Sequence, residues 1–105
     1  MNSYNLNDFK NGWFIGDFNP SLYKNNFEVG IKKYKKGDKE RKHYHKYSKE
    51  FTIIVAGAVK MNGTVYCKDS IIQINENEST NFESLEDTIT VVVKTASIEG
   101  DKHYD

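Results

Sequence analysis

The chain has 105 residues, which is enough for one compact domain and too few for two, since separate hydrophobic cores need roughly 50 or more residues each. Fifteen Lys and Arg residues balance fifteen Asp and Glu residues, so no net charge draws the chain onto nucleic acid or an anionic membrane. These counts exclude a multidomain enzyme and argue against a partner that is a nucleic acid or a membrane.

Three features indicate a cytoplasmic protein. The single cysteine, Cys67, cannot form an intramolecular disulfide, and the opening Met1–Lys10 lacks the apolar run of a secretory signal. The longest apolar run, Ile53–Val59, is far shorter than the roughly 18 residues that cross a bilayer.

The first 26 residues are rich in Asn and aromatic side chains and show no clear period. We predict that residues 1–26 form an arm, in which Trp13, Phe14 and Phe18 cover an edge of a sheet or pack on a partner subunit. Residues 27–97 are expected to form the main domain, and residues 98–105 a charged, solvated tail that contains His103.

The period of the main domain is two. Phe27, Val29 and Ile31 alternate with more polar neighbours, which is typical of a strand with one buried face. Further strands are predicted at Phe51–Val55, Thr64–Cys67, Ile71–Ile74 and Thr88–Lys94, with a type I′ hairpin at Asn62-Gly63. No sustained helix is expected, so the pattern indicates an antiparallel sandwich or barrel whose closure removes unpaired edges.

The alternation of side chains raises two questions: which face of residues 88–93 is buried, and whether Cys67 is buried. Thr88, Thr90 and Val92 share one face of their strand and Ile89, Val91 and Val93 share the other, and period two alone does not say which lines the interior. Cys67 shares a side with Val65, opposite Tyr66, and is expected to be a buried structural thiol.

The charges are sorted along the chain. Residues 32–49 hold nine of the fifteen basic residues, and residues 75–105 hold eight of the fifteen acidic ones. These segments are expected to be neighbouring strands with solvated ion pairs, or else to form a basic rim that attracts an anionic ligand.

One group of residues has side chains of the types that bind metal ions. His43 and His45 present two imidazoles on one face of a strand while Tyr44 points away, and Glu50 can return to them after a turn. Two imidazoles and one carboxylate suit iron, zinc, manganese or nickel, with open positions for substrate or water. The alternative is that both histidines are solvated members of a basic loop.

The segment GDKERKHYHKYSKEFTIIVAG, residues 37–57, resembles the first signature motif of the cupins: Gly, five residues, His-x-His, three or four residues, Glu, six residues, Gly. The resemblance extends from about Phe27 to Lys94. It implies an all-β double-stranded β-helix, the jelly-roll or cupin barrel, with His43, His45 and Glu50 as metal ligands inside it. It also implies a homodimer.

The second cupin motif departs from the family pattern. Lys68-Asp69 stands where the family has Gly-Asp, and Thr80 stands where the family has its fourth ligand, a histidine. A neutral hydroxyl is a poor ligand for these metals, so the site has three protein ligands or has lost its metal. Tyr34, Tyr44 and Tyr47 flank the candidate ligands and are predicted to orient a bound molecule.

Two functions follow as hypotheses. In the first, the protein binds a divalent metal and a small polar or anionic ligand; in the second, the same pocket binds a sugar or organic acid without metal. No phosphate-binding glycine loop or other nucleotide cofactor motif is present. Because cupins include dioxygenases, isomerases, epimerases and plain binding proteins, the resemblance leaves the reaction open.

Overall fold

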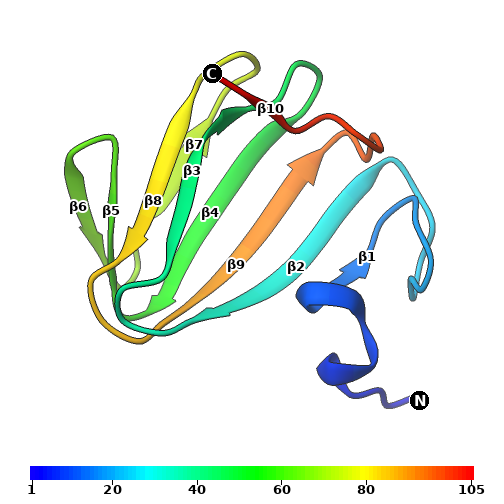
Figure 1. Ribbon diagram of the computed structural model, residues 1–105. Helices are drawn as coiled ribbons and strands as arrows, with labels where there is room; N and C mark the ends of the chain where they lie inside the picture. Colours follow the sequence, from blue (N-terminus) through cyan, green and yellow to red (C-terminus); the bar gives the residue numbers. More distant parts are fainter.

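The computed structural model describes residues 1–105 and contains two antiparallel sheets of five strands each, which face each other (Figure 1). In order across the first sheet, the strands are β1 (Trp13–Ile15), β2 (Phe27–Tyr34), β9 (Thr88–Thr95), β4 (Lys49–Ala56) and β7 (Ile71–Ile74). In order across the second sheet, they are β10 (His103–Tyr104), β3 (Lys39–Tyr44), β8 (Thr80–Ser84), β5 (Ala58–Met61) and β6 (Thr64–Cys67). The only helices are the 3₁₀ turns η1 (Leu6–Asp8) and η2 (Lys10–Gly12).

The all-β prediction is confirmed, but the expectation that closure removes the sheet edges is wrong. No strand of one sheet pairs with a strand of the other, so β1, β7, β10 and β6 remain edge strands. Each of these edges is only two to four residues long. Short edge strands offer little backbone for unwanted pairing, so protection comes from strand length and not from closure.

The hairpin predicted at Asn62-Gly63 is present between β5 and β6. Both turn residues have positive φ angles, 47° and 82°, as a type I′ turn requires, and Met61 pairs with Thr64 across it. This turn chemistry therefore fixes the register of the hairpin.

The apolar core occupies only part of the space between the sheets. Five buried side chains form it, with Tyr34, Tyr66 and Ile72 packed against them: Ile54, Val59, Met61, Ile74 and Phe82. On β9, the buried face is the one that carries Thr88, Thr90 and Val92, and Ile89, Val91 and Val93 lie on the opposite face. The interior near β9 is thus more polar than the exterior.

Cys67 is exposed, and the expectation of a buried thiol is wrong. On the edge strand β6, Tyr66 is the side chain that turns towards the core, and Val65 and Cys67 share the solvent face. The alternation of side chains along β6 was predicted correctly, but the face that was expected to be buried is the exposed one.

The basic and acidic segments of the sequence lie next to each other in the fold. β3, from the basic segment, pairs with β8, from the acidic segment, and Lys39 lies opposite Glu83. Lys49 Nζ lies 3.6 Å from Glu76 Oε1. These contacts agree with the interpretation as neighbouring strands with solvated pairs.

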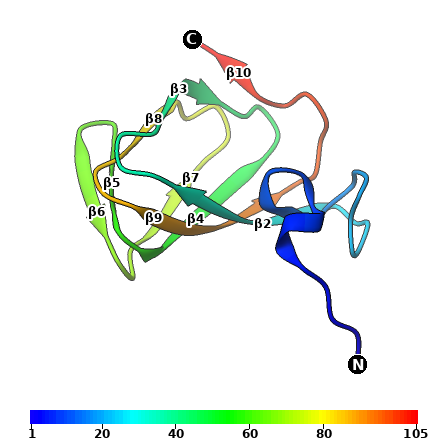
Figure 2. The same cartoon turned by 60° about the horizontal axis from the view of Figure 1, so that its bottom comes forward.

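Both termini add a strand to the sheets. β1 pairs with β2, and β10 pairs with β3, where it lies beside the strand in both views (Figures 1 and 2). Trp13 of β1 lies directly over Gly30 of β2, where an added Cβ would come 2.6 Å from the indole ring. No helix in the structure has the length and apolar character needed to span a membrane.

Candidate functional site

The two sheets enclose a cavity of about 170 Å³ beside the apolar core. Its walls come from both sheets and from both ends of the chain: Trp13, Lys32, Tyr34, Glu40, His43, His45, Glu50, Thr52, Met61, Thr80, Phe82, Thr90, Val92, Lys94 and Lys102. The residues predicted as metal ligands, His43, His45 and Glu50, all line this one cavity.

His43 lies at the end of β3, and His45 follows the strand. Their side chains are buried, with 7% and 6% of the residue surface exposed, and their ring centroids are 5.4 Å apart. Tyr44 between them stacks on His103 instead, with the ring centroids 5.4 Å apart. The histidines are therefore not solvated members of a basic loop, and strand alternation places them as expected.

Backbone carbonyls fix which nitrogen of each imidazole carries hydrogen. His43 Nδ1 lies 2.9 Å from the carbonyl oxygen of Arg41, and His45 Nδ1 lies 2.8 Å from that of Asp101. A carbonyl oxygen can only accept, so Nδ1 donates in both rings and the neutral form of each ring carries its lone pair on Nε2. Each ring therefore has an acceptor left for a ligand or a cation.

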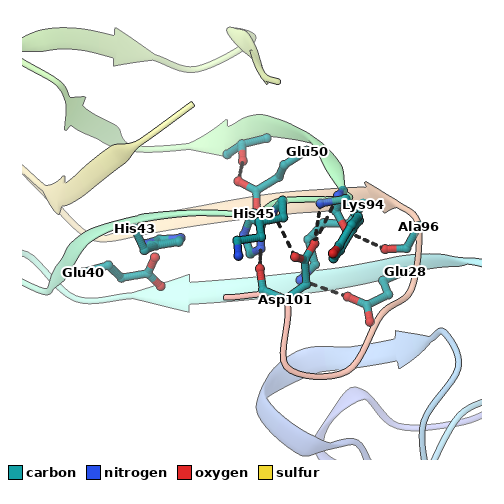
Figure 3. Close-up of polar contacts among 12 residues, drawn as sticks. Glu28, Glu40, His43, His45, Glu50, Lys94, Ala96 and Asp101 are labelled. Atoms are coloured by element: carbon teal, nitrogen blue, oxygen red, sulfur yellow. Dashed lines mark hydrogen bonds and ion pairs between the residues drawn. The ribbon is translucent and has the colours of Figure 1, made fainter. Parts of the chain in front are cut away.

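Glu50 on β4 faces His45 from the first sheet, as Figure 3 shows. Its Oε1 lies 3.8 Å from His45 Nε2, and its Oε2 accepts a hydrogen bond of 3.0 Å from the Thr52 hydroxyl. Burial, assisted by the charge of Lys94, lowers the pKa of His45 below its ordinary value. The ring is therefore neutral near pH 7, and its lone pair faces a carboxylate.

The donor types fit a divalent metal ion, but their arrangement does not. No group of three His, Cys, Asp or Glu side chains is gathered as a single ion requires. Of the two imidazoles, only that of His45 has a ring nitrogen within 4 Å of a Glu50 oxygen. A three-ligand centre would need the side chains to converge further than they do.

Two other predicted residues line the cavity. Thr80 pairs with His43 across β3 and β8, and its hydroxyl donates to the carbonyl of Asn81 at 2.8 Å. The Tyr34 hydroxyl donates to Glu40 Oε1 at 3.2 Å, and burial, with Glu40 beside it, raises the pKa of Tyr34 well above its ordinary value. Tyr34 is thus an uncharged wall of the cavity.

Tyr44 and Tyr47 do not line the cavity, contrary to their predicted role in orienting a ligand. Tyr44 alternates with the two histidines and so points to the opposite face of β3. Tyr47 lies in the turn before β4 and is 64% exposed. Nearness in sequence to the histidines therefore does not bring these rings to the site.

Lysines form the basic side of the cavity. Lys32 and Lys94 both lie over the ring of Trp13, with their Nζ atoms 5.5 Å and 5.2 Å from the ring centroid. Lys94 Nζ also pairs with Glu28 Oε1 at 3.0 Å, and burial lowers the pKa of Lys32. Lys102, from the C-terminal segment, completes this side.

Thr90 presents an unsatisfied hydroxyl on the cavity wall. The residue is completely buried, and its Oγ1 has no hydrogen-bond partner in the protein. A buried hydroxyl without a partner costs free energy, on the order of 1–3 kcal/mol. A bound molecule or water that reached Thr90 would remove this cost.

The sequence did not predict the role of Asp101, which holds residues 45–48, the loop between β3 and β4, in place (Figure 3). Its carboxylate accepts hydrogen bonds from the backbone N–H groups of Lys46, Tyr47 and Ser48 at 2.9–3.1 Å. Burial acts to raise the pKa of Asp101, but these hydrogen bonds outweigh it and lower the pKa below its ordinary value. The only sequence signal was an acidic residue in a charged tail, which gives no hint of a contact more than fifty positions away.

Solved structures show what this arrangement is similar to. A protein from Klebsiella pneumoniae with a double-stranded β-helix domain superposes with a TM-score of 0.66 at 18% identity, covering 72% of this chain and 68% of that one. KdgF from Halomonas sp. superposes with a TM-score of 0.64 at 15% identity, covering 70% and 73%. A sugar phosphate isomerase of the cupin superfamily from Silicibacter pomeroyi gives 0.63 at 20% identity, covering 69% and 52%.

These likenesses show the fold alone, because every identity is low. The chain has the cupin fold, the double-stranded β-helix, as the motif at residues 37–57 implied. No protein-family model matches the amino-acid sequence, and no curated protein matches it significantly.

Proposed function

We propose that this chain binds a small molecule with carboxylate and hydroxyl groups, such as a sugar acid or a hydroxy acid, in the cavity between its sheets. The observation that carries the proposal is the buried, unpartnered hydroxyl of Thr90 on the cavity wall. Buried polar groups are normally hydrogen-bonded, so such a group on a cavity wall points to a polar occupant.

The charges of the wall indicate what that occupant carries. Lys32, Lys94 and Lys102 offer cations to a carboxylate, and Glu40 and Glu50 offer acceptors to hydroxyls. The Nε2 atoms of the two histidines add two more acceptors. A sugar phosphate isomerase is among the structures with this fold, so the fold accommodates ligands of this polarity.

Calorimetric titration and thermal unfolding with gluconate, malate and glucose 6-phosphate test the proposal, with glucose as the uncharged comparison. An anion that binds the folded state raises the melting temperature as its concentration rises above Kd. Lys94→Met should abolish most of this rise, whereas Lys68→Met, on an exposed turn outside the cavity, should leave it intact. No stabilisation by any of the three anions at millimolar concentration would count against the proposal.

A divalent metal ion is the second candidate ligand. It is favoured by the hydrogen bonds that leave Nε2 of both His43 and His45 without hydrogen, beside the carboxylate of Glu50. Iron(II), zinc, manganese and nickel would be offered in turn in a non-chelating buffer, and the bound metal measured after gel filtration.

About one equivalent of metal per chain, lost in both His43→Gln and His45→Gln, would support this second function. Less than about a tenth of an equivalent with all four metals would reject it. The two candidates are separated by a chelator, because anion binding without metal is insensitive to EDTA.

A further inference from the structure

A second cavity adjoins the one between the sheets. It lies where β1 and the loop after it meet the C-terminal segment, and its volume is about 610 Å³, compared with about 170 Å³ for the first. The cavity between the sheets is called the inner cavity below, and the second one the outer cavity. Trp13, Lys94 and Lys102 line both cavities, so the two meet at these three side chains.

The inner cavity is small for a complete ligand. Pockets that enclose a small molecule typically measure roughly 300–1,000 Å³, and the inner cavity is below this range. A ligand that is larger than the inner cavity extends past Trp13, Lys94 and Lys102, because these residues form the boundary between the two cavities. The chemistry of the outer cavity therefore indicates what the rest of such a ligand carries.

Hydrogen bonds between distant parts of the chain hold the outer cavity in shape. The backbone N–H of Asp17 donates to the Ser97 hydroxyl at 2.8 Å, and this hydroxyl donates to Glu28 Oε2 at 2.9 Å. Glu28 Oε1 pairs with Lys94 Nζ at 3.0 Å. In both views the C-terminal segment passes beside the loop that follows β1 (Figures 1 and 2). Its walls are therefore joined to Lys94, which also lines the inner cavity.

The two cavities differ in charge. Three lysines and two glutamates line the inner cavity, which leaves it with an excess of positive charge for a carboxylate. The outer cavity has four lysines and four acidic residues and no net charge: Lys10, Lys24, Lys94, Lys102, Asp17, Glu28, Glu99 and Asp101. A ligand with one acidic end is therefore expected to place that end in the inner cavity and an uncharged part in the outer one.

Four charged side chains of the outer cavity are free to bind a ligand. Lys10, Lys24, Asp17 and Glu99 line it, and none of them forms an ion pair within the chain. The lysines donate hydrogen bonds and the carboxylates accept them. An uncharged group that satisfies both kinds of partner has to donate and accept, as a hydroxyl does.

Aromatic side chains supply much of the apolar surface of the outer cavity. Trp13 and Phe18 both line it, and both are partly exposed. The face of an aromatic ring is electron-rich, so it attracts C–H groups that neighbouring oxygen atoms make partly positive. A sugar ring has such C–H groups on its faces and hydroxyls around its edge. It therefore matches both the aromatic rings and the charged side chains of this cavity.

We propose that the ligand is a saccharide of at least two units with an acid at one end. The acid unit occupies the inner cavity, and a neutral sugar unit lies against Trp13 in the outer cavity, where Lys10 and Lys24 contact its hydroxyls. This inference rests on the proposed function, because it adds a second unit to the same ligand.

The test compares gluconate with three acids in which a neutral sugar is attached to gluconate: lactobionate, cellobionate and maltobionate. These provide both β and α linkages. Calorimetric titration should give a Kd at least about tenfold lower for one or more of the three than for gluconate. Trp13 is the only tryptophan, and its emission should shift further to the blue with that disaccharide acid than with gluconate, because the second unit removes water from the indole.

Variants assign this gain in affinity to the outer cavity. The double variant Lys10→Met and Lys24→Met should reduce the ratio of the two Kd values at least about threefold and leave the Kd of gluconate unchanged, because both lysines are exposed and neither lines the inner cavity. Trp13→Leu should reduce the ratio as well. The double variant Lys60→Met and Lys68→Met is the control, since it changes the charge equally at exposed positions outside both cavities, and it should leave the ratio unchanged.

The outcomes separate this inference from the proposed function. Gluconate that binds as tightly as all three disaccharide acids would overturn the inference and leave the proposed function standing. A gain in affinity that persists in both outer-cavity variants would overturn the inference too, because the second unit would then lie elsewhere. No binding of any of the four acids at millimolar concentration would count against both.

Discussion

The burial of His45 links the candidate site to pH at the scale of a single residue. Its folded-state pKa is lowered by burial, with Lys94 nearby, from an unfolded value of 6.5. Below pH 6.5 the unfolded chain therefore binds a proton that the folded chain resists, so the stability fully present above pH 6.5 is lost as the pH falls towards the folded pKa.

We predict that the free energy of unfolding decreases below pH 6.5 with a slope of up to about 1.4 kcal/mol per pH unit from this one group. Urea unfolding in the presence of a chelator, at several pH values between 7.5 and 5, measures the slope. His45→Gln should flatten it, because the variant has no imidazole at this position. An identical slope in His45→Gln would show that another group titrates.

Thr90 and Thr88 offer a matched pair on one strand. Both are buried on the same face of β9, but the Thr88 hydroxyl donates to the carbonyl of Glu86 at 2.9 Å, whereas that of Thr90 has no partner. Thr90→Val should stabilise the ligand-free protein by about 1 kcal/mol and weaken anion binding, and Thr88→Val should destabilise it by about 1 kcal/mol with binding unchanged. Equal stability changes in the two variants would contradict a difference in hydrogen bonding.

At the scale of elements, the segment around β10 acts as a clamp on the loop after β3. We predict that Asp101→Ala lowers the free energy of unfolding by about 3 kcal/mol, because three backbone N–H groups, that of Ser48 buried, lose a charged acceptor. Asp105→Ala is the control, since Asp105 is exposed and accepts only the Ser79 hydroxyl at 2.9 Å. Chemical unfolding measures the decrease in the free energy of unfolding of both variants. Equal decreases would show that the C-terminal segment does not hold the loop in place.

The contact of Trp13 with Gly30 makes the attachment of β1 measurable. A Cβ at position 30 would meet the indole at 2.6 Å, so we predict that Gly30→Ala displaces β1 and destabilises the protein by about 1–3 kcal/mol. Trp13 is the only tryptophan, and its fluorescence should shift to the red as it leaves the mouth of the cavity. Gly63→Ala strains a distant hairpin turn and should leave the emission unchanged, so a red shift there would point to general loosening instead.

Local patterns predicted those elements whose cause is local. The Asn62-Gly63 turn, the alternation through β2 and the shared face of His43 and His45 follow from backbone geometry within a few residues. The role of Asp101 could not be predicted in this way. Its partners lie more than fifty positions away, and hydrogen bonds between residues so far apart leave no periodic pattern in the sequence. Cys67 was misplaced for a related reason: alternation separates two faces but does not say which one the fold covers.

At the scale of the whole molecule, the polar cavity limits how much apolar surface one chain buries. Only six hydrophobic side chains are buried, and the threonines, histidines and an aspartate account for most of the other buried groups. A domain of this size with so small an apolar core has little stability of its own.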